Sequence, residues 1–530
     1  MRNLQYGKVK IRLNDNLSYK WTIGENGCVR GYAYVGEEYL EGSTLLAYLQ
    51  AAGTQEEMLK KIIQLNGLYS FILNAPFGVL ACVDQARSMP LFYQMGNEVM
   101  IYDNLDEEAI AGASVDEDML KIYKICLYTP TSKTLFRDFF QVQTGYYLLI
   151  NEAGIHQHPH FKYIYADQQI TDMDEAIQLL DKSMTETIQR TISVLNGRTA
   201  VIPLSGGHDS RLLIFYLKKL GYQKIIAYSY GLPGNGESTR SQKIAEVLDI
   251  PWYFVYYDPE GMQEFYQKEF RSYAMLAANG TSLPHLQDWY AVYKMKQQGV
   301  LPEDSVFIPG HAGDAAAGLF LWRDIAQAEP ITSQKLIDFI LRHGLDSGYL
   351  MGHEIMCSEE DKSAFRRELL EQYPKLSEKD HIFTEKEANQ VIDQKNGFSD
   401  RTSKFIGNSV RVYDFFGYSW LMPFFERSQL ENWCKIDNSL RRFKAVYFEQ
   451  ARRVYPDALN AIDFNPGQNW LALKDQMLME KPSFTHYELG YFRLGEEFYN
   501  EIRREILRGP NVYVRADYLD ILKEFCSLPE

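Results

Sequence analysis

The stretch Ser-Gly-Gly-His-Asp-Ser has the clearest chemistry in this 530-residue chain. Gly206 and Gly207 allow the backbone to turn tightly and to approach an anion closely. A helix that begins after them would add unpaired N–H groups and a positive dipole end, and Ser205 and Ser210 would add hydroxyl donors. Asp209 would repel a bare phosphate, so its carboxylate indicates a bridging Mg²⁺. The alternative is an ordinary strand-to-helix turn in which Ser or Asp caps the helix.

The pattern around this stretch predicts a parallel sheet covered by helices. Apolar runs alternate with amphipathic segments at the spacing of strand–helix–strand units, whose strands are parallel. The expected strands are 199–204, 224–230, 252–257 and 306–309, and the expected helices are 171–196, 211–220 and 237–248. The Ser-Gly-Gly stretch therefore follows a strand and precedes a helix. After residue 258 the chain is expected to be mostly helical.

The first 165 residues have a different, β-rich pattern. Short apolar or alternating runs separated by turn residues predict strands, and 44–52 and 114–124 predict helices. This is an α+β layer pattern. The predicted fold class is therefore an α+β sandwich at residues 1–165, followed at 166–530 by an α/β parallel-sheet domain with a helical C-terminal part.

The composition excludes several function classes. The chain is 46% hydrophobic and 24% charged, as globular proteins are. Its net charge of −15 makes it a poor general binder of nucleic acid or of anionic membranes. No run of 18 apolar residues and no signal-peptide pattern occurs, so no membrane span is expected. The six cysteines form no CxxC or Cys/His cluster, which argues against a disulfide framework or zinc site and favours a cytoplasmic location.

The Ser-Gly-Gly stretch resembles the signature of the PP-loop ATP pyrophosphatases, which bind ATP, adenylate a substrate and release pyrophosphate. It is not a Walker loop, because no Gly-Lys-Ser/Thr follows. Residues 234–248 resemble the helix that follows in one branch, the asparagine synthetase-like amide ligases, with Glu237 at an acidic position. The resemblance implies a PP-loop domain that uses ATP and Mg²⁺, with Ser205–Ser210 as the nucleotide-binding loop. The alternative for Glu237 is a solvent-facing amphipathic helix.

Residues 306–318 resemble a second loop of this family, which closes on pyrophosphate and Mg²⁺. Gly310, Asp314 and Gly318 fall at the matching positions. The resemblance therefore implies that Gly310 helps to bind the nucleotide and that Asp314 is a metal ligand together with Asp209. The alternative for Asp314 is a helix N-cap.

Two acids of that loop are replaced, by His311 and Ala315. We expect Asp314 and His311 to be the catalytic residues. A neutral His311 could take a proton from the incoming amine, and a cationic His311 could steady the leaving pyrophosphate. The third alternative is an exposed loop histidine with no role.

Residues 417–430 give a third resemblance, in which the acceptor side departs from the family pattern. Ser419 and Leu421 stand where the family has Glu and Arg, and the family's late lysine is missing after Tyr455-Pro-Asp. The resemblance thus implies an ATP side that is kept and an acceptor pocket that differs from the asparagine-making one.

Residues 1–165 resemble the glutaminase domain of the same family, an N-terminal-nucleophile (Ntn) fold, through 65–71 and 84–93. That chemistry needs a cysteine at the mature N-terminus, where the thiol attacks and the α-amine acts as base. The chain begins Met-Arg-Asn, and its first cysteine, Cys28, would need cleavage to be exposed. We therefore expect a retained scaffold without glutaminase activity.

The resemblance covers about residues 5–460 and implies an ATP-dependent, AMP- and pyrophosphate-forming amide ligase. The expected partners are a small-molecule or peptide carboxylate and an amine or ammonia, without nucleic acid or membrane, and a homodimer is considered. One alternative is an asparagine synthase that uses ammonia. Another is a non-catalytic nucleotide-binding regulatory or assembly protein, which would not exchange pyrophosphate into ATP.

Overall fold

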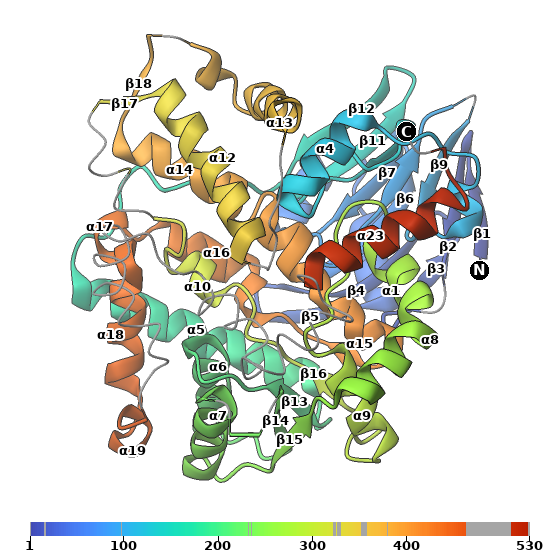
Figure 1. The fold of residues 1–530 in the computed structure, drawn as a ribbon. Coiled ribbons are helices and arrows are strands. Elements are labelled where there is room, and N and C mark those ends of the chain that lie inside the picture. The colour runs from blue at the N-terminus through green and yellow to red at the C-terminus, as the bar shows by residue number, and fades with distance from the viewer. Residues whose placement is uncertain are drawn as a thin grey trace.

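The computed structural model of the chain describes most residues of both predicted parts. These residues are 2–14, 17–96, 98–231, 233–234, 236–321, 325, 330–350, 358–378, 380–462 and 510–527. They form a mixed fold in which two mainly antiparallel sheets pack on each other and a third sheet is parallel (Figure 1). The predicted fold class is therefore confirmed, while the division at residue 165 remains a proposal.

The first 165 residues build the two mainly antiparallel sheets. One sheet contains, in spatial order, β1 (Arg2–Tyr6), β2 (Val9–Leu13), β9 (Val99–Tyr102), β8 (Phe92–Gln94) and β10 (Phe139–Gln141). The other contains β12 (Gly154–Pro159), β11 (Tyr146–Asn151), β7 (Gly78–Val83), β6 (Asn66–Ala75), β4 (Gly27–Val35) and β3 (Thr22–Gly24), with β5 (Glu38–Glu41) paired to β4. Only β2 and β9 pair in parallel.

Apolar side chains bind these two sheets to each other and to helices. Ile11, Ile72 and Ile101 belong to a core cluster between the sheets. Helices α1 (Gly42–Gln50) and α2 (Gln55–Gln64) bury Leu45 and Ile62 against the outer face of the seven-stranded sheet. Helices α3 (Glu107–Ile110) and α4 (Glu117–Cys126) pack into the core beyond the five-stranded sheet. Sheets and helices thus alternate as layers, each burying one apolar face.

The third sheet is parallel throughout and has the order β15-β14-β13-β16-β19. Its strands are β13 (Ala200–Pro203), β14 (Ile225–Gly231), β15 (Trp252–Tyr256), β16 (Val306–Phe307) and β19 (Ser419–Trp420). The covering helices are α5 (Met173–Leu195), α6 (His208–Lys219), α7 (Gly236–Val247), α8 (Pro259–Ala278) and α9 (Trp289–Gln297). Figure 1 shows α5, α6 and α7 on one side of the sheet and α8 and α9 on the other.

The strand order reverses direction at β13. The chain runs from β13 through β14 to β15 and then returns to place β16 on the other side of β13. In open parallel sheets such a reversal leaves a crevice at the carboxyl ends of the two neighbouring strands, where ligands bind. The loops after β13 and β16 are the two in which the sequence places its candidate residues.

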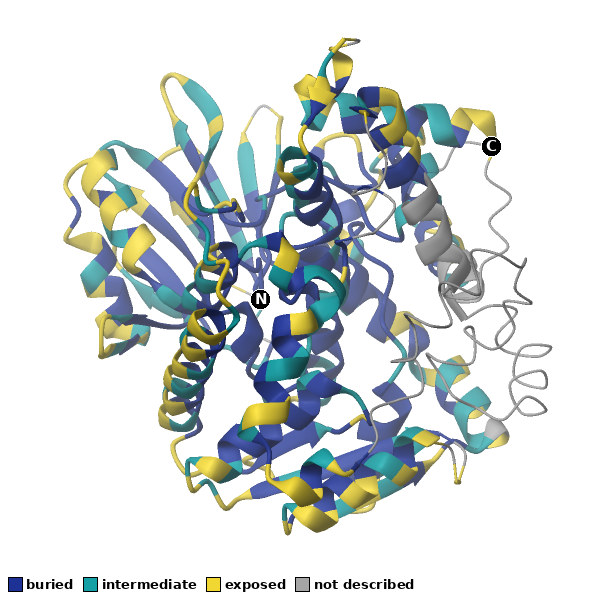
Figure 2. Cartoon of the chain, turned by 90° about the vertical axis from the view of Figure 1, so that its left-hand side faces the viewer, coloured by how far each residue is buried: buried dark blue, intermediate teal, exposed yellow. Residues whose placement is uncertain are grey.

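The remaining described residues are mostly helical and pack on both sheet systems. They are α10 (Gly313–Ala316), β17 (Ile331–Thr332), α12 (Ser333–Leu350), α13 (Glu359–Gln372), β18 (Ile382–Phe383), α14 (Glu385–Asn396), a π-helix (Thr402–Ile406), a 3₁₀ turn (Gly407–Val410), α15 (Arg411–Phe416), α16 (Arg427–Cys434), α17 (Asn438–Arg441), α18 (Ala445–Val454), α19 (Asp457–Asn460) and α23 (Pro510–Lys523). Figure 2 shows the inner strands buried and the exposed residues on outer helix faces, turns and edge strands such as β1. Among the described helices, none combines the length and apolar character that a membrane crossing needs.

The two sheets of residues 1–165, called the front sheets below, share a core with the helices before and after β19. Buried polar contacts also join these two parts of the chain. Arg427 donates from Nη2 to Nδ1 of His160 at 2.8 Å, and Gln85 donates to the carbonyl of Phe425 at 2.9 Å. The guanidinium of Arg411 donates to the Ser88 carbonyl at 2.7 Å. Each of these side chains is at most 6% exposed, so each bond satisfies a group that water does not reach.

Candidate active site

The predicted phosphate loop connects β13 to α6, and its two hydroxyl side chains shape the turn. The Gly207 N–H donates to Ser205 Oγ, and the Ser205 N–H donates to Ser210 Oγ, both at 3.1 Å. Helix α6 begins at His208, three residues earlier than the sequence pattern predicts, with Gly207 as its cap and no side-chain cap bond. Neither Ser nor Asp therefore caps the helix, although the alternative of an ordinary turn requires such a cap. Because glycine has no side chain, no N-cap oxygen accepts a hydrogen bond from the first N–H groups of α6.

A carboxylate already lies against the backbone of this loop. The Gly206 N–H donates to Glu237 Oε2 at 2.6 Å. The buried guanidinium of Arg211 fixes the other side of the same peptide by donating to the Gly206 carbonyl at 3.0 Å. Glu237 thus faces the loop instead of solvent, and the Gly206 amide points at an anionic oxygen.

Asp209 and Asp314, the predicted metal ligands, are brought together across 105 residues. The Asp314 N–H donates to Asp209 Oδ2 at 3.0 Å, and the Tyr447 hydroxyl donates to Oδ1 at 2.9 Å. Burial and then the charge of Asp314 raise the pKa of Asp209 to about 7. Asp314 is the second residue of α10, whose cap is Ala312, so the N-cap alternative for Asp314 is wrong. Two carboxylates that disfavour each other's charge suit a divalent cation.

Glycine is required where the second loop packs on α6. A Cβ at Gly310 would lie 2.6 Å from the backbone nitrogen of Ser210, closer than real contacts allow. A Cβ at Gly313 would lie 2.8 Å from the Asp209 carboxyl carbon. Both close approaches explain why this loop holds its backbone against the start of α6, at the crevice beside β13.

Lys444 completes the charged cluster, and the sequence pattern did not predict it. Its Nζ lies 3.2 Å from Asp314 Oδ2, and its side chain is 24% exposed. Phe443 and Lys444 both have φ of +60°, a left-handed conformation that non-glycine residues rarely adopt. Such strain persists where surrounding structure holds it and is frequent at functional sites. This turn, which directly precedes α18, places Lys444 beside the two aspartates.

His311 is held by a hydrogen bond and is not an exposed loop residue. Its Nε2 lies 2.7 Å from Ser409 Oγ, whose hydroxyl donates to the Ile406 carbonyl at 2.7 Å. Because that hydroxyl proton is already committed, we assign the imidazole N–H to Nε2 and the lone pair to Nδ1. Burial lowers the pKa of His311 to about 4, so the imidazole is neutral near pH 7. This favours the base over the cation among the expected roles.

The segment that carries Ser409 begins with a π-helix, a form often found at functional sites. His285 lies against this segment as well, with Nε2 at 2.8 Å from the Phe405 carbonyl. Burial, and then His311, lower the pKa of His285 to about 3. The neutral imidazoles of His285 and His311 therefore both contact the segment 402–410.

The residues that depart from the family pattern on the acceptor side lie in different surroundings. Ser419 begins the edge strand β19, and Leu421 follows it, 1% exposed, with its N–H donating to the Phe307 carbonyl at 2.9 Å. Leu421 is therefore part of the core. The residues after Tyr455-Pro-Asp in which the family's lysine is expected, 463 onward, lie outside the described residues.

Two carboxylates and no further side-chain ligand are a sparse set for a metal. Within the residues that the structure describes, no group of three or more His, Cys, Asp and Glu could hold an ion. Mg²⁺ is nevertheless commonly held by one or two carboxylates, with water and substrate phosphates as its other ligands. The donors present thus fit Mg²⁺ delivered with a nucleotide.

Cys28, the first cysteine of the chain, lies inside the seven-stranded sheet. It is on β4 and fully buried, and burial raises the pKa of its thiol to about 12. A nucleophilic cysteine needs the thiolate and access to substrate, and Cys28 has neither. The residue is a small core side chain.

Glutamine hydrolysis by the purified chain is expected to be absent. A Cys28→Ser variant serves as the control, because neither residue can act from inside the sheet. Glutamate release from glutamine is the measurement. Release by the unmodified chain above the level of the Cys28→Ser chain would show that this prediction is wrong.

Comparisons with known proteins give little beyond this geometry. No family model matches the chain, and no curated protein matches it. An NH3-dependent NAD synthetase from Campylobacter jejuni is 12% identical, covers 41% of this chain and 100% of its own, and has a TM-score of 0.21.

Two further solved structures are similarly distant. A Bacillus subtilis glutamine phosphoribosylpyrophosphate amidotransferase complexed with ADP and GMP is 11% identical, with coverage of 55% and 64% and a TM-score of 0.18. An NAD+ synthetase from Burkholderia pseudomallei is 15% identical, with coverage of 47% and 89% and a TM-score of 0.17. Scores this low carry no argument, so function is argued from the site itself.

Proposed function

We propose that the chain is an ATP-dependent amide ligase that releases AMP and pyrophosphate. The supporting observation is the pair Asp209 and Asp314, which meets beside the start of α6 at the reversal of the strand order. A nucleotide's phosphates are the ligand that a helix N-terminus, a carboxylate pair for Mg²⁺ and a lysine together suit. A substrate carboxylate would attack the α-phosphate, and an amine or ammonia would then attack the acyl-adenylate.

The backbone and side chains of the two loops would bind and orient the phosphates. The Gly206 amide already contacts a carboxylate oxygen, and Ser205, at the exposed apex of the loop, adds a hydroxyl. Asp209 and Asp314 would hold Mg²⁺, which when bound neutralises part of the phosphate charge. Catalysis of this kind depends on positioning and charge stabilisation.

His311 would remove the proton from the attacking amine. Its Nε2–H is fixed by Ser409, so Nδ1 carries the lone pair. Among the described residues, Nδ1 of His311 has no hydrogen-bond partner. A neutral imidazole is the form that a general base requires.

The test is carboxylate-dependent exchange of pyrophosphate into ATP by the full chain. A panel of free and peptide carboxylates is screened with labelled pyrophosphate, and aspartate with ammonia is one arm, read by asparagine formation. Exchange with any member supports the ligase. ATP binding without exchange across the panel would instead favour a non-catalytic nucleotide-binding protein.

Replacing Lys444 by methionine is expected to lower kcat at least tenfold, about 1.4 kcal/mol in barrier, with a smaller change in KM. The ammonium lies beside Asp314, where negative charge develops on the leaving pyrophosphate. Lys435→Met is the matched control, because Lys435 is an exposed lysine whose ammonium donates to the side chain of Asn432 at 2.8 Å, away from the two aspartates. A folded Lys444→Met chain with the unmodified kcat would refute the assignment.

A further inference from the structure

Arg87 is a buried arginine in an unusual backbone conformation. It lies in the turn between β7 and β8, with φ of +52°. Its side chain is 4% exposed, and its guanidinium lies 5.5 Å from the centre of the Phe92 ring. Few non-glycine residues adopt this φ, so the surrounding structure holds the side chain in place.

Two N–H groups of this guanidinium have no acceptor. Nε and Nη2 are fully buried and lack a hydrogen-bond partner, and within the described ranges no carboxylate forms an ion pair with Arg87. Asp84 is close in sequence, but its oxygens accept from the backbone N–H groups of Tyr69 at 3.0 Å and Ala86 at 2.7 Å and from the Ser88 hydroxyl. Asp84 is within electrostatic range of Arg87, but Nε and Nη2 donate no hydrogen bond to it.

The neighbouring buried charges leave an excess of positive charge. Lys395 and Lys404 share one carboxylate, Asp400, at 2.9 and 2.7 Å. Arg411 is neutralised by Asp414 at 2.7 Å. Burial and then Arg411 lower the pKa of Arg87 to about 9, which places these cations within electrostatic range of each other. With Asp84, whose charge raises the pKa of Arg87, the four cations of this group are matched by three carboxylates, Asp84, Asp400 and Asp414.

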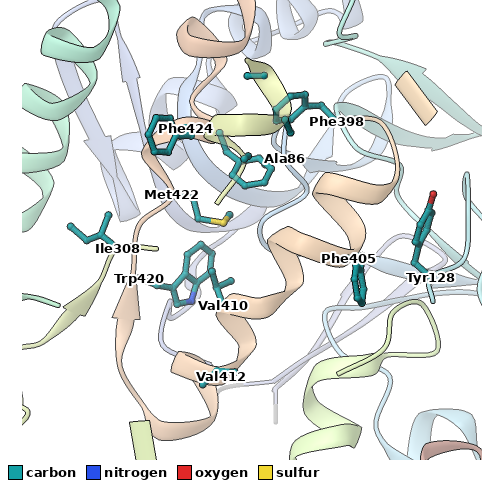
Figure 3. Packing of buried hydrophobic residues seen from close by; sticks show 14 of the residues in the cluster. Ala86, Tyr128, Ile308, Phe398, Phe405, Val410, Val412, Trp420, Met422 and Phe424 are labelled. Carbon is teal, nitrogen blue, oxygen red and sulfur yellow. The ribbon is translucent and has the colours of Figure 1, made fainter. Parts of the chain in front are cut away.

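The turn also borders apolar side chains. Figure 3 shows Ala86, the residue before Arg87, in one cluster with Phe398, Phe405 and Val410. A buried guanidinium whose donors lack acceptors is unfavourable, because the desolvation of those donors is not compensated. Arginine keeps its charge under these conditions, so the charge must be matched.

We propose that Arg87 binds a small carboxylate through Nε and Nη2 at the junction of the front sheets and the 402–411 segment. These two N–H groups lie on one edge of the planar guanidinium, where they form the parallel pair of bonds that a carboxylate accepts. The site does not depend on ATP or on the proposed ligase reaction.

The site borders the segment that positions His311. Arg411 donates to the carbonyl of Ser88, the residue after Arg87. Ser409, two residues before Arg411, bonds to His311. A carboxylate on Arg87 is thus bound beside a chain segment that reaches the candidate base.

Equilibrium dialysis of the full chain with labelled acetate, without ATP, tests the site directly. The expected result is saturable binding of about one acetate per chain, with affinity at least tenfold lower in Arg87→Met. Arg87→Lys keeps the charge but not the paired donors and is also expected to bind at least tenfold more weakly. Arg137→Met, at an exposed arginine, is the matched control and is expected to bind as the unmodified chain does.

Two outcomes would overturn the proposal. One is the absence of saturable acetate binding to the unmodified chain, which does not require any variant to fold. The other is equal affinity in folded Arg87→Met. Displacement of acetate by N-acetylglycine would show that the carboxylate of a larger substrate reaches the site, and acetate binding without displacement would show a site for small free acids. Since no turnover is measured, failure here is distinguishable from failure of the ligase proposal.

Discussion

The Asp209→Asn chain is expected to be more stable than the unmodified chain at pH 8, while it binds ATP with Mg²⁺ more than tenfold more weakly. The pKa of this carboxyl is about 7 in the folded chain, against an ordinary value of 3.8. Between those values the folded state holds a proton that the unfolded state has lost. The free energy of unfolding therefore falls as the pH rises from about 4 to about 7, and the full penalty remains above pH 7.

The neutral amide removes that penalty. Because Asp209 keeps some contact with solvent, we expect a gain of about 1–3 kcal/mol, less than the full shift would give. Urea unfolding at pH 8 and pH 5, with a chelator present, measures it, and the gain should shrink at the lower pH. Binding of ATP with Mg²⁺ should weaken more than tenfold.

Asp167→Asn is the control for this experiment, since Asp167 is exposed and the same substitution there removes no buried charge. An Asp209→Asn chain that is equally stable or less stable at pH 8 would contradict the charge argument. Unchanged affinity for ATP with Mg²⁺ in the folded variant would contradict the assignment of Asp209 as a ligand.

Replacing His311 by alanine is expected to lower kcat by about 10²–10⁴-fold, as loss of a general base does. Because the pKa of His311 is about 4, the imidazole is the free base throughout the neutral range, and its own titration should reduce the rate only as the pH falls toward 4. That acid limb of kcat should disappear in His311→Ala. Rates are measured against pH with a carboxylate identified by pyrophosphate exchange.

Ser409→Ala tests the positioning of the same imidazole. Without the acceptor at Nε2, the two tautomers compete, so kcat should fall about tenfold with little change in KM, and the acid limb should shift. His156→Ala, at an exposed histidine, should leave both rate and profile unchanged. If His311→Ala keeps the unmodified rate and pH profile, His311 has no part in the reaction.

The fold was largely predictable because its signals are local. Alternating apolar and amphipathic segments gave the strands and helices around β13, and only boundaries moved, as when α6 began at His208 instead of Arg211. The edge strand β19 was not predicted, because two residues that pair with β16 carry no pattern of their own. Helix α2 was also missed, although Thr54 and Glu57 form the capping box that marks its start.

The site was predictable only as far as its motifs extend. Asp209 and Asp314 lie in recognisable loops, so their types and spacing suggested shared chemistry. Lys444 reaches Asp314 across 130 residues through a turn with two left-handed residues, and neither Phe nor Lys indicates such a turn. Ser409 reaches His311 across 98 residues from a 3₁₀ turn that follows a π-helix, and neither has a sequence signature. Contacts of this kind depend on tertiary packing.

The buried polar contacts across the front sheets bear on how such a chain evolves. Arg427 donates hydrogen bonds to His160 and to the Leu65 carbonyl, and Glu426 accepts one from the Asn66 side chain. A fragment that began near residue 166 would remove the His160, Leu65 and Asn66 partners from these groups. Selection on the later residues alone would therefore also act on residues 1–165, because substitutions there would remove buried contacts from the later helices. Buried contacts of this kind make one part of a chain necessary to the structure of another, whatever reaction either part carries out.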